Sequence, residues 1–208
     1  MVSIEEFTEF VKKKYNSIPT SRNERMIRHS HKLLTIGLDP HTTLDSFLNE
    51  IAMTICRHLG FMVGSIALID PKDGKFRYVA TVGLRKEAEE ALKKMEYSLE
   101  VANDLQKYPR IILSKTVLYY PGELHPFMPG EEIMFRRPSE IGKERQSLDS
   151  MREDDWIGCR FFNREGKLLG WIDGDNTPDG KLPERESIFW LEFLADLVGI
   201  VLVERFHY

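Results

Sequence analysis

The sequence predicts an α+β protein in which antiparallel strands are flanked by helices. Two pairs of short apolar segments, within residues 61–82 and 156–174, each surround a polar turn that contains Gly. Such pairs are typical of β-hairpins, whose strands run antiparallel. Segments with apolar residues at steps of three and four precede and follow the hairpins, which is typical of amphipathic helices. With 208 residues, 42% of them hydrophobic, the chain is long enough to bury a substantial core.

Two helices are predicted in an N-terminal helical extension, residues 1–36. The first covers residues 3–14 and the second residues 22–35, each with apolar side chains at helical spacing. Gly37 is expected to end the second helix, because Gly is common just after a helix C-terminus. Residues 17–23 are expected to form a linker between the two helices.

A domain of residues 37–208 is expected to follow, and it begins with the strongest helix signal of the chain. Asp39-Pro40 is expected to open this helix and Gly60 to end it. Its apolar residues recur at helical steps: Leu44, Phe47, Leu48, Ile51, Ala52, Ile55 and Leu59.

The middle of the domain predicts a hairpin, short helices and a further strand. The hairpin consists of residues 61–69 and 76–82, and alternation predicts that the even-numbered residues of its second strand share the more buried face. Helical turns are expected at residues 88–95 and 98–105, followed by one strand at residues 111–120.

The last third of the chain predicts a long loop, a second hairpin and a long helix. Residues 121–155 show no periodicity, and a loop of this length is usually a lid, a binding loop or disordered. We expect this loop to decide ligand specificity. A hairpin at residues 156–174 leads to a helix from Pro183 to about Phe206 with a narrow polar stripe. This helix needs a second packing partner, either the N-terminal helices or the same helix of another subunit.

Charge and composition argue against several classes of protein. A net charge of -4 provides no general attraction for nucleic acid. The N-terminus lacks the pattern of a secretory signal, and the most apolar run, Ile188–Val203, is shorter than the roughly 20 residues that a membrane span requires. Two cysteines without CxxC spacing suit reduced thiols. A cytoplasmic protein without nucleic-acid or membrane partners is expected.

The order of these elements, together with four local patterns, resembles a GAF domain, a sensory module found beside PAS and histidine-kinase modules. The resemblance covers roughly residues 40–207. Its patterns are Leu44-x-x-Phe47-Leu48-x-x-Ile51 before Gly60, the strand Val63-Gly64-Ser65-Ile66-Ala67-Leu68-Ile69-Asp70, the hairpin end at residues 166–176, and Asp179-Gly180-Lys181-Leu182-Pro183.

The resemblance implies an α/β/α layered fold with a central antiparallel sheet of five or six strands. The N- and C-terminal helices would cover one face, and pocket-forming helices and a loop the other. Members of the family sense cyclic nucleotides, tetrapyrroles, haem, amino-acid-like metabolites or simple gases. A non-catalytic regulatory domain is therefore expected, which binds an unidentified small-molecule effector, signals to a separate partner protein and forms a homodimer through its terminal helices. The sequence indicates no particular cofactor and no metal.

Eight residues form the candidate ligand pocket. The aromatic residues border the long loop and have polar tips, and the arginines suit an anionic ligand. Core packing of the aromatic residues, and a solvated loop in which glutamates balance the arginines, remain alternatives. The candidates are Tyr119, Tyr120, Arg136, Arg137, Trp156, Cys159, Trp171 and Asp173.

Several other polar residues have a structural interpretation that we favour. Asp173 and Asp175 surround Gly174, and turn chemistry is favoured there over metal binding or acid–base catalysis. His125 is alone in the long loop and is expected to be exposed. His29 and His31 are two residues apart on a predicted helix, a poor geometry for one metal ion, and are expected to be solvated.

The cysteines leave a second class of function open. Cys56 and Cys159 are expected to be buried structural thiols. The alternative is a thiol-dependent free methionine sulfoxide reductase, an activity found on this fold with clustered cysteines. A ligand-free dimerisation or adaptor module is the third hypothesis.

Overall fold

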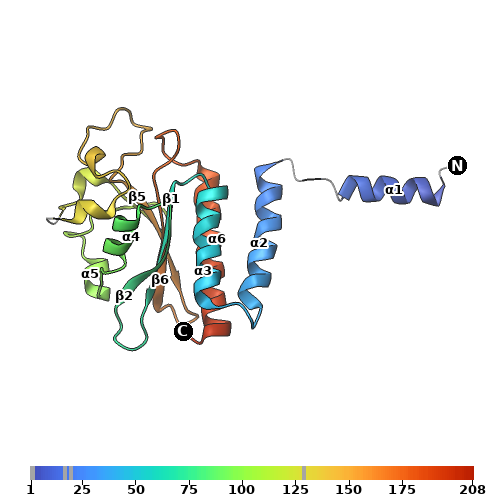
Figure 1. Ribbon diagram of the computed structural model, residues 1–208, viewed down its shortest axis with the longest axis horizontal. Helices are drawn as coiled ribbons and strands as arrows, with labels where there is room; N and C mark the ends of the chain where they lie inside the picture. Colours follow the sequence, from blue (N-terminus) through green and yellow to red (C-terminus); the bar gives the residue numbers. More distant parts are fainter. Residues whose placement is uncertain (1–2, 16–17, 19–20, 128–129) are drawn as a thin grey trace. The chain divides into compact units, whose positions relative to one another are not determined.

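The computed structural model describes residues 3–15, 18, 21–127 and 130–208 (Figure 1). The chain divides into two compact units, residues 1–32 and 33–208. The domain boundary predicted after residue 36 stays a prediction.

Two helices begin in the first unit. They are α1 (Ile4–Tyr15) and α2 (Arg22–Leu38), and α2 continues into the second unit. Each begins with a reciprocal cap between a serine and the glutamate three residues later. Glu6 N donates to Ser3 Oγ at 3.1 Å and Glu24 N to Ser21 Oγ at 3.1 Å, while the backbone N of each serine donates to the side chain of that glutamate. Positions 17, 19 and 20 of the predicted linker lie outside the described residues.

Gly37 does not end α2 as predicted. The helix continues to Leu38, and a Cβ at Gly37 would lie 2.8 Å from Val201 Cγ2 and 3.0 Å from Phe47 Cε2. Glycine is therefore present because the helix packs closely here. The next helix, α3 (Leu44–His58), begins later than expected, since Thr43 accepts a hydrogen bond from Ser46 N as its N-cap.

The second unit contains one antiparallel sheet, as predicted. Its six strands, within the described residues, have the order β2-β1-β6-β5-β4-β3. They are β1 (Val63–Ile69), β2 (Phe76–Val82), β3 (Ile111–Ile112), β4 (Val117–Tyr120), β5 (Trp156–Phe162) and β6 (Leu168–Asp175). The single strand predicted at residues 111–120 is wrong, because β3 and β4 are two strands that pair with each other.

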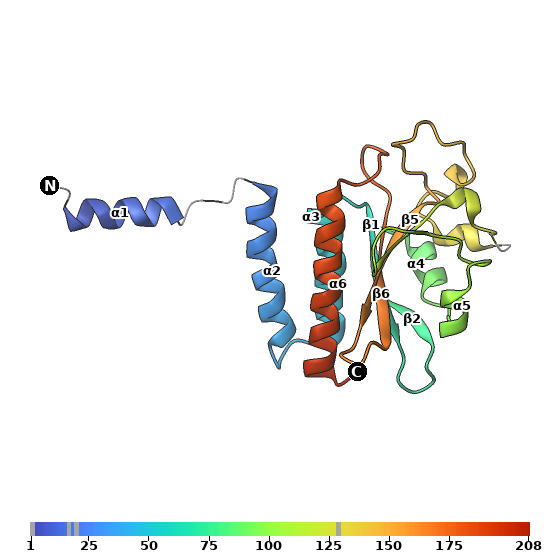
Figure 2. The same cartoon turned by 180° about the vertical axis from the view of Figure 1, so that it is seen from behind.

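Helices cover both faces of the sheet (Figures 1 and 2). On one face lie α3 and the 22-residue α6 (Arg185–Phe206), which contact each other and the strands. On the other face lie α4 (Lys86–Leu92), α5 (Leu99–Asn103) and the short 3-10 helices η1 (Gly122–Leu124), η2 (Glu131–Met134) and η3 (Pro138–Glu140). The layered α/β/α arrangement is therefore confirmed.

A β-bulge in the first hairpin reverses the faces of β2. Tyr78 pairs with Ala67 and Ala80 pairs with Ile66, so two neighbouring residues of β1 face residues two apart on β2. Val79 is the extra residue, and side chains before and after it point to opposite faces. The prediction that the even-numbered residues of β2 share one face is wrong. Tyr78 instead faces α4 and α5, whereas Ala80 faces α3.

Candidate functional site: a cavity between the sheet and its roof

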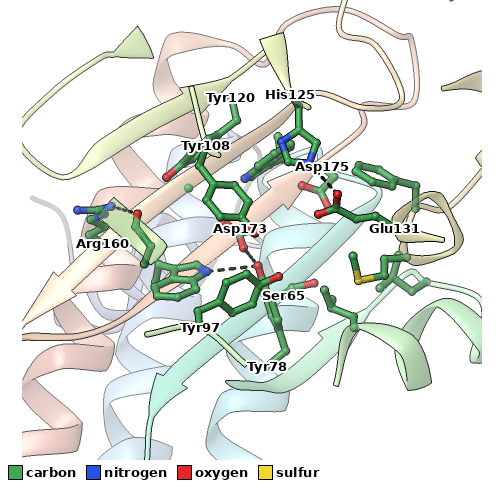
Figure 3. A pocket seen from close by; sticks show the side chains of 18 residues that line it. Ser65, Tyr78, Tyr97, Tyr108, Tyr120, His125, Glu131, Arg160, Asp173 and Asp175 are labelled. Atoms are coloured by element: carbon green, nitrogen blue, oxygen red, sulfur yellow. Dashed lines mark hydrogen bonds and ion pairs between the residues drawn. The ribbon is translucent and has the colours of Figure 1, made fainter. Parts of the chain in front are cut away.

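A cavity of about 110 Å³ lies between the sheet and the segments that cover the α4 and α5 side (Figure 3). Strands β1, β2, β4, β5 and β6 form its floor. The floor includes Ser65, Tyr78, Trp156, Trp171, Asp173 and Asp175. The roof includes Leu92, Tyr97, Tyr108, His125, Glu131 and Phe135.

Strand alternation places two carboxylates on the floor. Asp173 and Asp175 are two residues apart on β6, so their side chains share the face that lines the cavity. Gly174 between them faces the other way, where a Cβ would lie 2.9 Å from the Phe61 ring. Turn chemistry, the interpretation favoured from the sequence, is therefore wrong for both aspartates, because they belong to a strand.

Asp173 is 4% exposed and accepts a short hydrogen bond. Tyr78 Oη donates to Asp173 Oδ2 at 2.6 Å, and Trp171 Nε1 donates to Tyr78 Oη at 3.3 Å (Figure 3). Burial raises the pKa of Asp173 from 3.8 to about 7, against the lowering effect of the Tyr78 and Trp171 hydrogen bonds. The carboxyl group therefore titrates near neutral pH.

Asp175 lies in a still less favourable place for a charge. Burial raises its pKa well above the usual value, and the negative charges of Asp173 and Glu153 add to the effect. Its Oδ1 is buried and has no hydrogen-bond partner among the described residues.

Ser65 and His125 add two more unpartnered polar atoms to the cavity wall. Among the described residues, Ser65 Oγ and His125 Nδ1 are buried without a hydrogen-bond partner. Ser65 is 2% exposed and lies opposite Asp173 in the β1–β6 register. Because buried polar groups in folded proteins are nearly always hydrogen-bonded, unpartnered atoms around one cavity indicate a place for a polar ligand.

His125 belongs to the roof rather than to the solvent. Its side chain is 5% exposed, so the expected exposure is wrong. Nε2 lies 3.3 Å from Glu131 Oε2, and the ring stacks on Tyr108 with centroids 5.6 Å apart. The ring also meets Trp156 edge-on at 5.2 Å. These contacts join the loop to the floor.

Aromatic rings form most of the remaining wall. Trp171 meets Tyr78 and Tyr97 edge-on, with centroids 6.3 and 5.9 Å apart. Tyr120 stacks on Trp156 at 4.7 Å. Burial raises the pKa of Tyr78, Tyr97 and Tyr120, so the phenols stay protonated near neutral pH.

Arg160 is the floor's basic side chain, and it holds α5. Nη1 donates to Asn103 Oδ1 at 2.8 Å and Nη2 to Ala102 O at 2.9 Å. Arg110 also donates to carbonyl oxygens of α5. The last carbonyls of a helix attract cations, so this arrangement fixes the roof to β5.

Three consecutive acids anchor the long segment 121–155. Glu153, Asp154 and Asp155 are at most 4% exposed. Arg137 donates to Glu153 at 2.8 Å, Arg152 to Asp154 at 2.6 Å.

Asp155 accepts hydrogen bonds from several parts of the chain. It accepts from Tyr119 Oη at 2.6 Å, from Gly122 N at 2.9 Å and from Arg145 Nη2 at 3.0 Å. Arg145 and Arg152 each also pair with Glu123. The described part of this segment therefore has a defined structure, since buried charges require partners of this kind. The partners in these pairs are Glu123 and the acidic residues 153–155, and not the glutamates that were expected to balance the arginines, which are Glu131, Glu132, Glu140 and Glu144.

No protein-family model matches the chain, and no curated protein matches it. Several solved structures are similar to this chain. A GAF domain/HD domain protein from Geobacter sulfurreducens has a TM-score of 0.56 at 10% identity, over 84% of this chain and 99% of that one. The GAF domain of A. aeolicus nlh2 in an inactive state has a TM-score of 0.56 at 13% identity, over 89% and 99%.

The chain has a GAF-domain fold. A further similar structure is the chromophore-binding domain of the Stigmatella aurantiaca bacteriophytochrome. It has a TM-score of 0.54 at 12% identity, over 92% of this chain and 63% of that chain.

The cavity of this GAF fold brings together half of the residues predicted from the sequence. Tyr120, Trp156, Trp171 and Asp173 line it.

Four predicted residues lie elsewhere. Tyr119 binds Asp155, Arg137 binds Glu153, and Arg136 Nη1 lies 3.7 Å from Met62 Sδ. Cys159 alternates with Gly158 and Arg160, so it faces α6. The sequence reasoning missed the contributions of Ser65, Tyr78, Tyr97, Tyr108, His125, Glu131 and Asp175. Strand alternation was a signal for Asp175 alone.

Both thiols are held in the neutral form. Burial raises the pKa of Cys56 to about 11 and that of Cys159 to about 12. Within the described residues, no three His, Cys, Asp or Glu side chains form a group that could hold a metal ion. In the same part of the chain, no helix is long and apolar enough to cross a bilayer.

Proposed function

We propose that this chain is a non-catalytic sensory domain that binds a small-molecule effector in the cavity under its roof. The observation that carries the proposal is the cavity itself, which has buried polar atoms without partners on its wall. Pockets that combine apolar walls with a few convergent polar groups are typical ligand sites. The similar bacteriophytochrome domain binds a chromophore, which supports a ligand for this fold.

The effector's signal passes to a separate partner protein in the cytoplasm, and the protein forms a homodimer through α6. Phe189, Phe193 and Ile200 are 53%, 44% and 55% exposed, and their spacing puts them on one side of the helix. Between the two phenylalanines, Glu192 accepts hydrogen bonds from Ser114 and Thr116 in the β3–β4 turn. Strand β4 carries Tyr120 into the cavity, so a chain of contacts joins the ligand site to the proposed dimer face.

A screen of small metabolites against the full chain tests effector binding. We expect at least one class of compound to raise the melting temperature, because ligands that bind the folded state stabilise it. Gly158→Ala is the matched variant, and it should lose this shift because its new methyl group would occupy part of the cavity. The added Cβ would lie 3.0 Å from Asp173 Oδ1 and 3.2 Å from Tyr120 Cε2. A broad screen in which no compound shifts the wild type would refute the sensor.

Light scattering tests the dimer. Phe193→Glu is expected to give a monomer, whereas Ile112→Glu, which changes a 73% exposed residue on the edge strand β3, leaves a dimer. A dimer without any bound effector would favour the ligand-free adaptor. The raised pKa of both thiols argues against the reductase, because the thiolate is the reactive form.

A further inference from the structure

We propose that the cavity takes a small primary ammonium ion, with Asp173 and Asp175 as its counter-ions. This inference rests on the proposed function and names the ligand class of that site. Four features of the cavity carry it: its excess of carboxyl groups over basic side chains, its unpartnered acceptors, its aromatic wall and its volume.

The floor holds two carboxyl groups, Asp173 and Asp175, but one basic side chain, Arg160, whose charge acts on Asp173. The charges that act on Asp175, those of Asp173 and Glu153, are both negative. Arg160 is engaged with Ala102 and Asn103 of α5. A buried carboxylate without a counter-charge is costly, and a cation in the cavity would remove that cost.

The unpartnered atoms suit an ammonium group. Asp175 Oδ1 is an acceptor when ionised, and the hydroxyl oxygen of Ser65 accepts as well. A primary ammonium group has three N–H donors and no acceptor. Because Ser65 lies opposite Asp173 in the strand register, acceptors from β1 and β6 occupy neighbouring positions on one face of the sheet.

The aromatic wall adds to the attraction for a cation. Tyr78, Tyr97 and Trp171 lie beside Asp173, with ring centroids 5.9 to 6.3 Å apart. Ring faces attract cations, and most strongly where water is excluded. The wall near Trp156 and Phe135 is apolar and suits a short alkyl chain.

The volume limits the ligand. A cavity of about 110 Å³ is smaller than the roughly 150 Å³ cavity that admits benzene, so about four or five non-hydrogen atoms fit inside it. An anion of this size would be repelled by the two aspartates. A bare metal ion is disfavoured, because within the described residues no three ligating side chains come together.

The proposal predicts the sign of a pH dependence. An ammonium ion binds the ionised carboxylates, so its binding releases protons from groups whose pKa values are raised. Affinity should therefore rise with pH through the pKa of Asp173, which is about 7. A neutral ligand would show little dependence, and an anion the opposite sign. The other titratable or charged groups that face these carboxylates are Tyr78 on β2, Tyr120 on β4, Arg160 on β5, Glu153, and Tyr97, Tyr108, His125 and Glu131 of the roof.

Titration calorimetry on the full chain with four small probes tests the ligand class. The probes are n-butylammonium, tetramethylammonium, 1-butanol and butyrate, compared at equal ionic strength. We expect n-butylammonium to bind tightest, with an affinity that rises several-fold between about pH 6 and 7. Tetramethylammonium carries the same charge on the same number of non-hydrogen atoms but has no N–H donor. It should bind about tenfold more weakly.

Substitutions of the counter-ions provide the matched variants. Asp173→Asn and Asp175→Asn keep the side-chain shape and should each weaken n-butylammonium binding about tenfold or more. Asp149→Asn changes an exposed aspartate outside the cavity lining and should leave binding unchanged. Circular dichroism checks that each variant is folded.

Tighter binding of butyrate or 1-butanol, or an affinity for n-butylammonium that falls with pH, would overturn the ammonium assignment. So would the failure of all four probes to bind. The proposed sensor function would survive either result if the broad metabolite screen still finds a ligand that Gly158→Ala excludes.

Discussion

Asp173→Asn tests whether burial of this carboxyl group makes the stability of the fold depend on pH. The pKa of Asp173 is raised from 3.8 to about 7 in the folded protein. Between these values the folded chain holds a proton that the unfolded chain has lost. The free energy of unfolding of the wild type therefore falls as pH rises from about 4 to about 7.

The size of the effect follows from the shift. One pKa unit corresponds to about 1.4 kcal/mol, so a shift of about three units corresponds to about 4 kcal/mol. Asn has nearly the same shape, and its amide oxygen can accept the Tyr78 hydrogen bond, but it does not ionise. We therefore expect the stability of the wild type, relative to Asp173→Asn, to fall by about 4 kcal/mol between pH 4 and pH 8.

Urea unfolding at a series of pH values, followed by tryptophan fluorescence, measures this difference. Asp175 is present in both proteins, but the charge of Asp173 helps to raise its pKa, so the difference between the two profiles reports Asp173 together with this coupling. Asp149→Asn, whose aspartate side chain is 64% exposed, is the matched control and should follow the wild-type profile. Parallel pH profiles for the wild type and Asp173→Asn would show that this carboxyl group is not desolvated as the structure indicates.

Three further substitutions or reactions test other parts of the structure. Gly158→Ala should lower the affinity of a cavity ligand at least tenfold in a calorimetric titration, because the new methyl group would lie 3.0 Å from Asp173 Oδ1. An unchanged affinity would mean that the ligand binds elsewhere. Asp155→Asn should reduce the free energy of unfolding by about 3 kcal/mol in urea, since it leaves Arg145 without its buried partner. Glu140→Gln is the control, because Glu140 pairs with Lys143 at an exposed site, and it should leave the midpoint of urea unfolding unchanged. Equal effects of Asp155→Asn and Glu140→Gln would contradict a structural role for the acidic residues 153–155. Cys56 should react with a thiol reagent at pH 8 about a hundredfold more slowly in the folded protein than in the protein unfolded by urea, because its pKa is about 11 instead of 9.0. Equal rates would mean that Cys56 is an exposed, reactive thiol in the folded protein.

Local patterns predicted the elements well. The hairpins, the helix before β1 and the long final helix follow from periodicity and turn residues within short windows, and each is present. Four of the eight candidate residues line the cavity, because strand residues beside the long segment face it in alternation.

The remaining site residues depend on contacts between distant parts of the chain. Tyr78 and Asp173 are 95 positions apart, and a bulge at Val79 decides that Tyr78 faces the cavity. His125 was expected to be exposed because nothing near it in sequence shows that Tyr108 and Trp156 enclose it.

The sequence by itself determined most of the strands and helices, and that the strands of the two predicted hairpins pair antiparallel, since these properties depend on neighbouring residues. Only the tertiary structure decided that two aspartates of β6 share a cavity with roof side chains, and that Arg145 pairs with Asp155 rather than with a ligand. The physical reason is that burial and charge pairing depend on what packs against a side chain, and that neighbour comes from elsewhere in the chain.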